Sequence, residues 1–177
     1  MGAKLVTVFG ENHKRNLPSH LATILLLDPD TGSLLAIMDG RYITEARTAA
    51  VSAVSARFLA RPDASTLAII GSGVQARSHL EAYQLVRQLK EVRIWSPKSR
   101  SREQFVDDMH GRVPVPIVAA ETAEAAVRGA DLIVLVTSSP TPVIDDAWVS
   151  KGAHVVCVGA CRPNQQEMPP ALVARSR

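Results

Sequence analysis

The sequence has few aromatic residues and almost no excess of charge of either sign. Of its 177 residues, 4% are aromatic, and the formal net charge is +3. A nucleic-acid groove combines stacking aromatics with a strongly basic surface, so this composition does not indicate nucleic-acid binding. No apolar run has the length of a membrane span, and the N-terminus lacks the basic and apolar regions of a signal peptide. We therefore expect a cytoplasmic protein that binds neither nucleic acid nor membranes.

Cysteine is also scarce. Cys157 and Cys161 are the two cysteines of the chain, and they lie four residues apart beside one expected strand. This spacing matches neither a disulfide framework nor a four-ligand zinc pattern, so we expect reduced thiols and no metal site. Apolar residues are abundant instead, at 46% against 21% charged, which is an ordinary globular balance for one domain or slightly more.

The first third of the chain is typical of an antiparallel sheet followed by a helix. Apolar stretches predict strands at 4–9, 22–27 and 34–38. Asp28-Pro29-Asp30-Thr31-Gly32 is a turn cluster and predicts a hairpin between the last two strands. Apolar residues then recur at helical spacing over Thr44–Leu59, with Thr44 as the expected N-cap and Pro62 ending the helix.

The remainder alternates between apolar runs and helical stretches. Strands are predicted at 67–70, 92–95, 115–117, 132–136 and 154–158. A parallel pair of strands needs a long crossover, so strands that alternate with helices predict βαβ units and a parallel sheet. The sequence therefore predicts an α/β fold in which an antiparallel part precedes a parallel one.

A glycine-rich turn follows the first of these strands. Gly71-Ser72-Gly73-Val74-Gln75-Ala76 has the form G-x-G-x-x-A and precedes an amphipathic helix. In a dinucleotide site, the first glycine allows the turn, the second admits a pyrophosphate, and the small residue lets helix and strand pack closely. The helix N-terminus then offers N–H groups to the anion. A tight turn without a ligand is the alternative, but the position in the first βαβ unit favours dinucleotide binding.

The loop after the second strand bears on which dinucleotide is bound. An acidic residue there accepts hydrogen bonds from the ribose of NAD, whereas this chain has Ser96-Pro97-Lys98-Ser99-Arg100-Ser101, with no carboxylate before Glu103. Hydroxyls and cations bind a phosphate dianion, so we favour NADPH, with NADH possible. A solvated basic loop is the alternative. Two polar or small-residue segments follow the last strands: Thr137 and Ser138 follow the fourth strand, and Gly159-Ala160-Cys161 follows the fifth. These residues either face a nicotinamide ring or are ordinary loop residues.

Taken together, several stretches resemble the ornithine cyclodeaminase/mu-crystallin family, and its ketimine reductase branch in particular. The resemblance covers nearly the whole chain, through KLVTVF, LPSHLATILLLDPDTGSLLAIMDG, ITEARTAAVSA, IIGSGVQA, VRIW, GADLIVLVT and GAHVVCVGACRP. It implies a homodimer in which a Rossmann domain, here 61–177, accompanies a dimerisation and substrate domain, here the partial segment 1–60. Members of this family are considerably longer, so we expect this chain to be incomplete at both ends.

The resemblance also implies roles for individual residues. Lys4 matches the substrate lysine, and Arg47 matches the arginine that holds the substrate carboxylate and lies near the cofactor. The implied cofactor contacts are Ser19, His20, Arg47, Gly71, Ser72, Gly73, Val74, Gln75, Ser96, Pro97, Lys98, Ser101, Thr137, Ser138 and Val158. Pro97 stands where an arginine is usual in the branch, which removes one cation from the expected 2′-phosphate loop.

The implied reaction is reduction of a cyclic ketimine or imino acid by NAD(P)H, with a hydride passing to the carbon of the C=N bond. Cyclodeaminases of the family have an aspartate after the fifth-strand glycine, where this chain has Cys161. A thiol does not replace a carboxylate at the same pKa, so ammonia loss from ornithine is the less favoured alternative. A non-catalytic protein that binds NADPH or iodothyronines is the other alternative.

Overall fold

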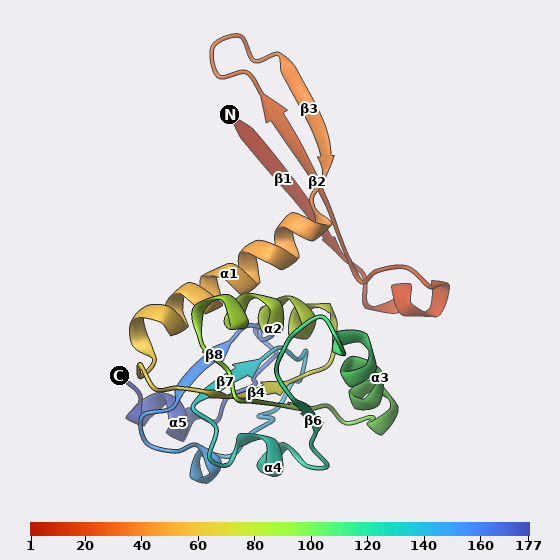
Figure 1. Ribbon diagram of the computed structural model, residues 1–177. Coiled ribbons are helices and arrows are strands. Elements are labelled where there is room, and N and C mark those ends of the chain that lie inside the picture. The colour runs from red at the N-terminus through yellow and green to blue at the C-terminus, as the bar shows by residue number, and fades with distance from the viewer. The chain divides into compact units, whose positions relative to one another are not determined.

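The computed structural model of the chain describes residues 1–177, apart from the side chain of His13. The chain separates into two compact units, Met1–Arg47 (unit 1) and Thr48–Arg177 (unit 2) (Figure 1). The strands are β1 (Gly2–Val8), β2 (His20–Leu27), β3 (Leu34–Asp39), β4 (Thr66–Ile70), β5 (Glu91–Trp95), β6 (Ile117–Ala119), β7 (Leu132–Leu135) and β8 (His154–Cys157). The helices are α1 (Arg41–Leu59), α2 (Val74–Val86), α3 (Ser99–Met109), α4 (Ala123–Val127) and α5 (Pro170–Arg175), with 3₁₀ turns at Gly10–Arg15 and Asp146–Trp148.

Unit 1 holds an antiparallel sheet in the order β1-β2-β3, which confirms the predicted strands and hairpin. The turn between β2 and β3 is closed by Asp28, whose Oδ1 accepts hydrogen bonds from the backbone N–H groups of Asp30 and Thr31, each at 2.9 Å. These two N–H donors lower the pKa of the Asp28 carboxyl. Gly32 then takes a φ of 72°, which an L side chain rarely adopts.

Helix α1 begins three residues earlier than the sequence predicts. The expected N-cap Thr44 lies inside the first turn, where its hydroxyl donates to the carbonyl of Gly40 at 2.7 Å. Gly40 is the N-cap residue, since its carbonyl accepts from the N–H of Thr44 at 3.0 Å. The preceding Asp39 supplies the side-chain cap, because its Oδ1 accepts a 2.7 Å hydrogen bond from the N–H of Arg41. Strand β3 ends at Asp39, so the chain enters the helix directly after the strand.

Unit 2 holds a parallel sheet in the order β6-β5-β4-β7-β8. This is the order of a Rossmann-type sheet, and the crevice where the order reverses, between β4 and β7, is the usual ligand site of such folds. The predicted βαβ alternation is therefore confirmed. Strand β6 starts at Ile117 rather than at 115, because Pro116 has no N–H and joins β5 only through its carbonyl, which accepts from Val92 at 3.0 Å.

Helices cover both faces of this sheet (Figure 1). On one face, α2, α3 and the second half of α1 pack on Leu67, Ile69, Val92, Ile94, Leu132 and Val134. On the other face, α4 and α5 pack on Ala68, Ile70, Ile133 and Leu135. The side chains of successive residues in β4 and β7 thus point to opposite faces of the sheet and pack in different core clusters, as the period of two in a strand requires. The assignment of 1–60 and 61–177 to separate domains stays a prediction.

Candidate functional site

The two glycines after β4 differ in whether the fold requires a glycine at their position. Gly71 has a φ of 114°, and a Cβ there would lie 2.6 Å from the carbonyl oxygen of Val136, so the turn itself requires glycine. Gly73 has an ordinary φ of −79°, and a Cβ there would meet nothing within 4 Å. The fold therefore does not need glycine at 73. A glycine whose missing Cβ would point into open space is what the close approach of a ligand phosphate needs.

The N-terminus of α2 is free to receive an anion. Its N-cap is Gly73, which supplies no side-chain hydrogen bond to the first N–H groups of this thirteen-residue helix. Ala76 is fully buried, so the helix packs closely on the sheet. The Oε1 atom of Gln75 is buried without a hydrogen-bond partner. Uncapped N–H groups and the positive end of the helix dipole favour a phosphate here.

A cleft opens beside this turn. It has a volume of about 390 Å³ and is lined by Ser72, Gly73, Arg77, Arg100, Ser101 and Gln104, so it joins the glycine turn to the first turns of α3. A dinucleotide whose pyrophosphate lies on α2 extends its adenosine end toward the second strand, and here that strand leads into α3. Of the residues expected to contact the pyrophosphate and the 2′-phosphate, Ser72, Gly73 and Ser101 line this cleft.

The loop between β5 and α3 is fixed by hydrogen bonds to the glycine turn and to α3. The hydroxyl of Ser72 donates to that of Ser96 at 3.0 Å, and Arg102 donates to the Ser96 carbonyl at 2.6 Å. Lys98 and Arg100 are exposed, and among the described residues neither forms an ion pair. Arg100 lines the cleft and Lys98 precedes α3 in this loop, and unpaired cations of this kind favour a dianionic ligand group.

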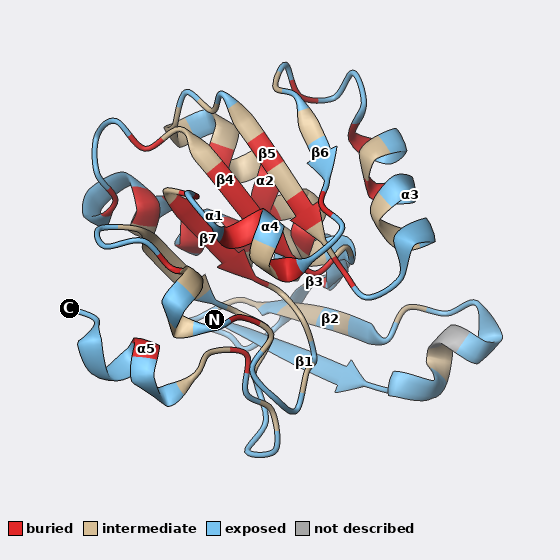
Figure 2. Cartoon of the chain, turned by 90° about the horizontal axis from the view of Figure 1, so that it is seen from below, coloured by how far each residue is buried: buried red, intermediate tan, exposed pale blue. Residues whose placement is uncertain are grey.

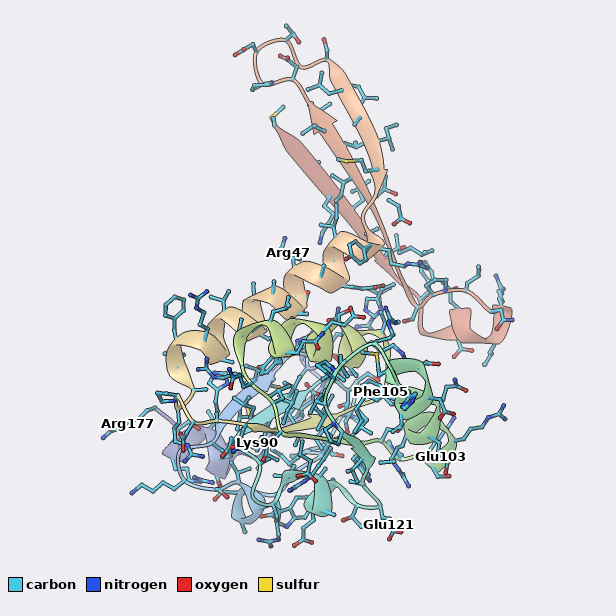
Figure 3. All side chains as sticks on the ribbon, viewed as in Figure 1. Arg47, Lys90, Glu103, Phe105, Glu121 and Arg177 are labelled. Carbon is cyan, nitrogen blue, oxygen red and sulfur yellow. The ribbon has the colours of Figure 1, made fainter. Side chains whose placement is uncertain are left out.

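Arg77, which the sequence reasoning missed, braces the cleft. Its guanidinium donates to the carbonyls of Ser72 at 2.7 Å and Gly73 at 3.1 Å, pairs with Asp108 on α3, and lies 5.4 Å from the centre of the Phe105 ring. Hydrogen bonding from Arg77, more than from Gln104, lowers the pKa of Asp108. Phe105 lies on the inner side of α3 and Glu103 on its outer side (Figure 3). No sequence motif indicates Arg77, because its role depends on contacts with Asp108 and Phe105, which lie far along the chain on α3.

The expected nicotinamide residues lie at the carboxyl ends of β7 and β8. Thr137 follows β7, and its Oγ1 accepts from the N–H of Ser139 at 3.2 Å, while the side chain of Ser138 is exposed. Val158 follows β8 and is joined to β7 by a 2.9 Å bond from its N–H to the carbonyl of Leu135. The two strand ends are therefore neighbours on the crevice side of the sheet.

Unit 1 carries the remaining predicted residues. Lys4 on β1 donates from Nζ to Thr44 Oγ1 at 3.2 Å, and Arg47 lies three residues after Thr44, on the same face of α1. Arg47 is exposed, and Figure 3 shows it projecting from the helix. The hydroxyl of Ser19 and Nδ1 of His20 are 3.0 Å apart. Lys4 is thus held beside the helix face that presents Arg47.

The two cysteines are free thiols in unit 2, as expected. Burial and the neighbouring Glu167 raise the pKa of Cys157 to about 11, so this thiol stays protonated at neutral pH. Cys161 Sγ lies 3.2 Å from the carbonyl of Val158. Among the described residues, no group of three or more histidine, cysteine and acidic side chains is placed to hold a metal ion. In the same part of the chain, every helix is too short or too polar to span a bilayer.

The structure brings the predicted cofactor residues of unit 2 to one edge of the parallel sheet. In unit 1, Lys4 lies beside the start of α1, whereas Ser19 and His20 lie at the start of β2, where His20 pairs with Val8. The cofactor and catalytic roles of Lys4, Arg47, Ser19, His20 and the unit 2 residues stay predictions. A further residue at the crevice edge, the buried Glu167, was assigned no role by the sequence reasoning. Its surroundings in the sequence, Asn164 to Pro170, have the composition of an ordinary surface loop.

Known proteins share both this sequence and this fold. The ketimine reductase mu-crystallin of Rattus norvegicus is 44% identical over 174 residues, which are 98% of this chain and 54% of that protein. The Δ1-pyrroline-2-carboxylate reductase of Thermococcus litoralis, solved with NADH and L-proline, superposes with a TM-score of 0.95 at 35% identity, over 99% of this chain and 54% of that one. A lysine cyclodeaminase superposes with a TM-score of 0.88 at 37% identity, over 99% and 52%.

The chain spans about half the length of these relatives. The sequence pattern that defines the ornithine cyclodeaminase/mu-crystallin family matches residues 1–177. This match covers the antiparallel unit as well as the parallel sheet, so it does not reflect the dinucleotide-binding fold alone. The chain belongs to the ornithine cyclodeaminase/mu-crystallin family.

Proposed function

We propose that the protein to which this chain belongs reduces cyclic ketimines or imino acids with NADPH. The observation that carries this proposal is the open cleft that joins the uncapped N-terminus of α2 to the exposed cation Arg100, which forms no ion pair among the described residues. The relative from Thermococcus litoralis was solved with NADH and L-proline, which is the reduced product of a cyclic imino acid. Both the cofactor class and the substrate class of the family therefore suit this site.

The preference for NADPH over NADH is our inference from charge. A 2′-phosphate is a dianion near neutral pH, and a cation or hydroxyl beside it forms charge-assisted hydrogen bonds. The cleft offers Arg100 and Ser101, Lys98 lies next to them in the chain, and no acidic side chain is among the residues that line the cleft. Pro97 supplies no cation, so the discrimination rests on the remaining groups.

In this proposal each residue has a defined task. The bound reduced nicotinamide supplies the hydride for the carbon of the C=N bond. Arg47 holds the substrate carboxylate with the paired donors of its planar guanidinium. Lys4, positioned by Thr44, donates a proton to the imine nitrogen, or orders a water that does so. Thr137, the exposed Ser138 and Val158 line the ring of the cofactor. A cytoplasmic homodimer is the setting we propose for this reaction.

The test is a fluorescence titration of the 177-residue chain with NADPH and with NADH. We expect tighter binding of NADPH, and we expect Arg100→Ala to weaken NADPH by about tenfold, or about 1.4 kcal/mol, without changing NADH. Arg57→Ala on exposed α1 is the matched control and is expected to leave both affinities unchanged. Equal affinity for both nucleotides would refute the assignment of NADPH.

Turnover is tested separately with pyrroline-2-carboxylate and piperideine-2-carboxylate as substrates, by following loss of NADPH. Lys4→Ala and Arg47→Ala are expected to abolish it. The similarity to a lysine cyclodeaminase supports a second candidate, loss of ammonia from ornithine or lysine with no net change in cofactor. Ammonia released from these diamines, without imine reduction, would favour that lyase. Cys161, in place of the aspartate that cyclodeaminases have, disfavours it.

A further inference from the structure

Glu167 is the one carboxylate that is fully buried among the described residues. Its exposed fraction is 0%, although it lies in the irregular segment between β8 and α5. Burying a carboxyl group is costly unless hydrogen bonds replace its lost hydration. Glu167 has no arginine, lysine or histidine among its hydrogen-bond partners in the described part of the chain, so backbone donors replace that hydration.

These donors come from two different strand ends. Oε1 accepts the backbone N–H of Thr137, directly after the end of β7. Oε2 accepts the N–H groups of Gly159 at 2.7 Å and Ala160 at 3.1 Å, after β8, and the thiol of Cys157 at 3.3 Å. One oxygen thus accepts from the loop after β7 and the other from the loop after β8. The side chain therefore bridges the two loops at the carboxyl edge of the sheet.

The backbone around Glu167 reinforces the bridge. Its carbonyl accepts from the N–H of Val143 at 3.0 Å, and the N–H of Gln166 donates to the carbonyl of Ser139 at 3.0 Å. The two strand ends are also in direct contact, since a Cβ on Gly159 would lie 1.7 Å from the carbonyl oxygen of Thr137. The loops after β7 and β8 are therefore held together by the segment that contains Glu167.

We propose that Glu167 is a positioning residue that fixes the loops after β7 and β8 for the nicotinamide end of the cofactor. The inference rests on the proposed function, because it takes the glycine turn after β4 as the pyrophosphate site. At the switch point of a Rossmann-type sheet, a dinucleotide whose first half lies over β4 and β5 places its second half over β7 and β8. Thr137, Ser138 and Val158 lie in those loops, and Glu167 holds the backbone that carries them.

Glutamate fits this task better than its nearest analogues. A carboxylate has two acceptor oxygens, and both are used here. Glutamine offers one acceptor oxygen and one NH₂ donor. At one of the two strand ends, this NH₂ group would meet a backbone N–H, and neither group could accept a hydrogen bond. Aspartate is shorter by one methylene and does not span the same two partners without moving a loop. Glu167→Gln is therefore a near-isosteric change that breaks the bridge on one side.

The experiment compares two ligands of the 177-residue chain. NADPH occupies both halves of the proposed site, whereas adenosine 2′,5′-bisphosphate occupies the adenosine half alone. For Glu167→Gln we expect NADPH to bind about tenfold more weakly and adenosine 2′,5′-bisphosphate to stay within about twofold, because a broken hydrogen bond at the loops leaves the adenosine cleft intact. Glu121→Gln, an exposed glutamate labelled in Figure 3, is the matched control and changes neither affinity.

The outcomes separate the two proposals. Equal weakening of both ligands by Glu167→Gln, or no weakening of either, would overturn the positioning role while leaving the dinucleotide site in place. Failure of the unaltered chain to bind either ligand would overturn the proposed function, and the positioning role with it. Amide exchange of the unaltered chain needs no variant: the N–H groups of Thr137, Gly159 and Ala160 are expected to exchange more slowly than that of the exposed Ser138. Exchange as fast as that of Ser138 would show that the bridge does not hold.

Discussion

The two sheets of this chain have similar hydrogen-bonded ladders but very different burial (Figure 2). All four residues Leu67–Ile70 of β4, and all four residues of β7, are 0% exposed. In unit 1, every residue of β1 is exposed, and β2 and β3 contain none that is buried. Leu5 and Ile37 are each 64% exposed. One sheet therefore has a core on each face and the other has none of its own.

The difference shows that regular strands do not by themselves make a stable unit. A backbone hydrogen bond exchanges for one with water and contributes about 1 kcal/mol net, whereas apolar burial contributes about 25 cal/mol for each Å². Unit 2 gains from burial through α1 to α5, as its two core clusters show. Unit 1 keeps large apolar side chains in contact with water, so apolar burial stabilises its folded state less than that of unit 2.

The largest expected effect of this contrast is in amide exchange. β2 and β4 are a matched pair, since each has a hydrogen-bonded strand on both sides. We expect β4 amides to exchange about 10³-fold more slowly than β2 amides, because β4 opens only when unit 2 unfolds whereas unit 1 opens locally. Hydrogen–deuterium exchange read by NMR at low protein concentration measures this ratio.

Protein concentration sharpens the same measurement. If a second copy of the chain covers unit 1, as the proposed homodimer requires, protection of β2 rises with concentration while that of β4 does not change. Equal protection of β2 and β4 at every concentration would contradict the contrast between the two sheets.

A smaller effect is expected from one added methyl group in each unit. A Cβ on Gly159 would meet the backbone of Thr137 at 1.7 Å, whereas a Cβ on Gly40 would meet the side chains of Ala22 and Ile24 at 3.0 Å. Gly159→Ala is expected to lower the free energy of unfolding by about 3 kcal/mol or more, because a backbone cannot yield by that distance. Gly40→Ala is expected to cost less than about 1 kcal/mol. Urea titration of both variants provides the comparison.

A substitution at Gly73 tests whether a glycine is needed for ligand binding and not for folding. Gly73→Ala adds a methyl group where nothing lies within 4 Å, so urea titration is expected to show little change in stability while affinity for NADPH falls. If Gly73→Ala unfolds the chain as readily as Gly159→Ala, the distinction between fold-required and ligand-required glycines is wrong.

The sequence predicted unit 2 well for physical reasons. Alternating apolar runs and helices permit only parallel crossovers, and the G-x-G-x-x-A turn has few other uses after a first strand. For β2, by contrast, the continuous apolar run from Ile24 to Leu27 indicates burial that this chain does not supply. The apolar pattern of unit 1 thus predicts burial that the strands of this unit do not have.

The residues that sequence reasoning missed act through contacts distant in the chain. Arg77 matters because it joins the glycine turn to Asp108, 31 residues later. Glu167 matters because it accepts from Thr137, 30 residues earlier, and no local pattern distinguishes it from a surface glutamate. The start of α1 was misplaced for a local reason, since Thr44 was expected as the cap, whereas the carboxylate of Asp39, at the end of β3, accepts from the N–H of Arg41.

The smallest expected effect is a pH dependence confined to unit 2. His79 is fully buried; its Nδ1 donates to the carbonyl of Gln75 at 2.7 Å, and its Nε2 lies 3.0 Å from the hydroxyl of Ser52. Burial lowers the pKa of His79, and burial followed by the charge of Arg87 lowers that of His154. A lowered pKa in the folded state means that the stability is full above the unfolded value near 6.5 and is lost as pH falls through the folded value.

Urea titrations between pH 7 and pH 5 are therefore expected to show unit 2 losing stability as the solution becomes more acidic. His79→Gln should remove part of this slope, with His154 accounting for part of the rest, because glutamine cannot be charged in this range. His110→Gln, at an exposed position after α3, is the control that keeps the full slope. Since unit 1 has no buried histidine among its described side chains, β2 exchange should not follow the same pH dependence. An unchanged slope in His79→Gln would mean that the buried imidazole is not what links stability of the parallel sheet to pH.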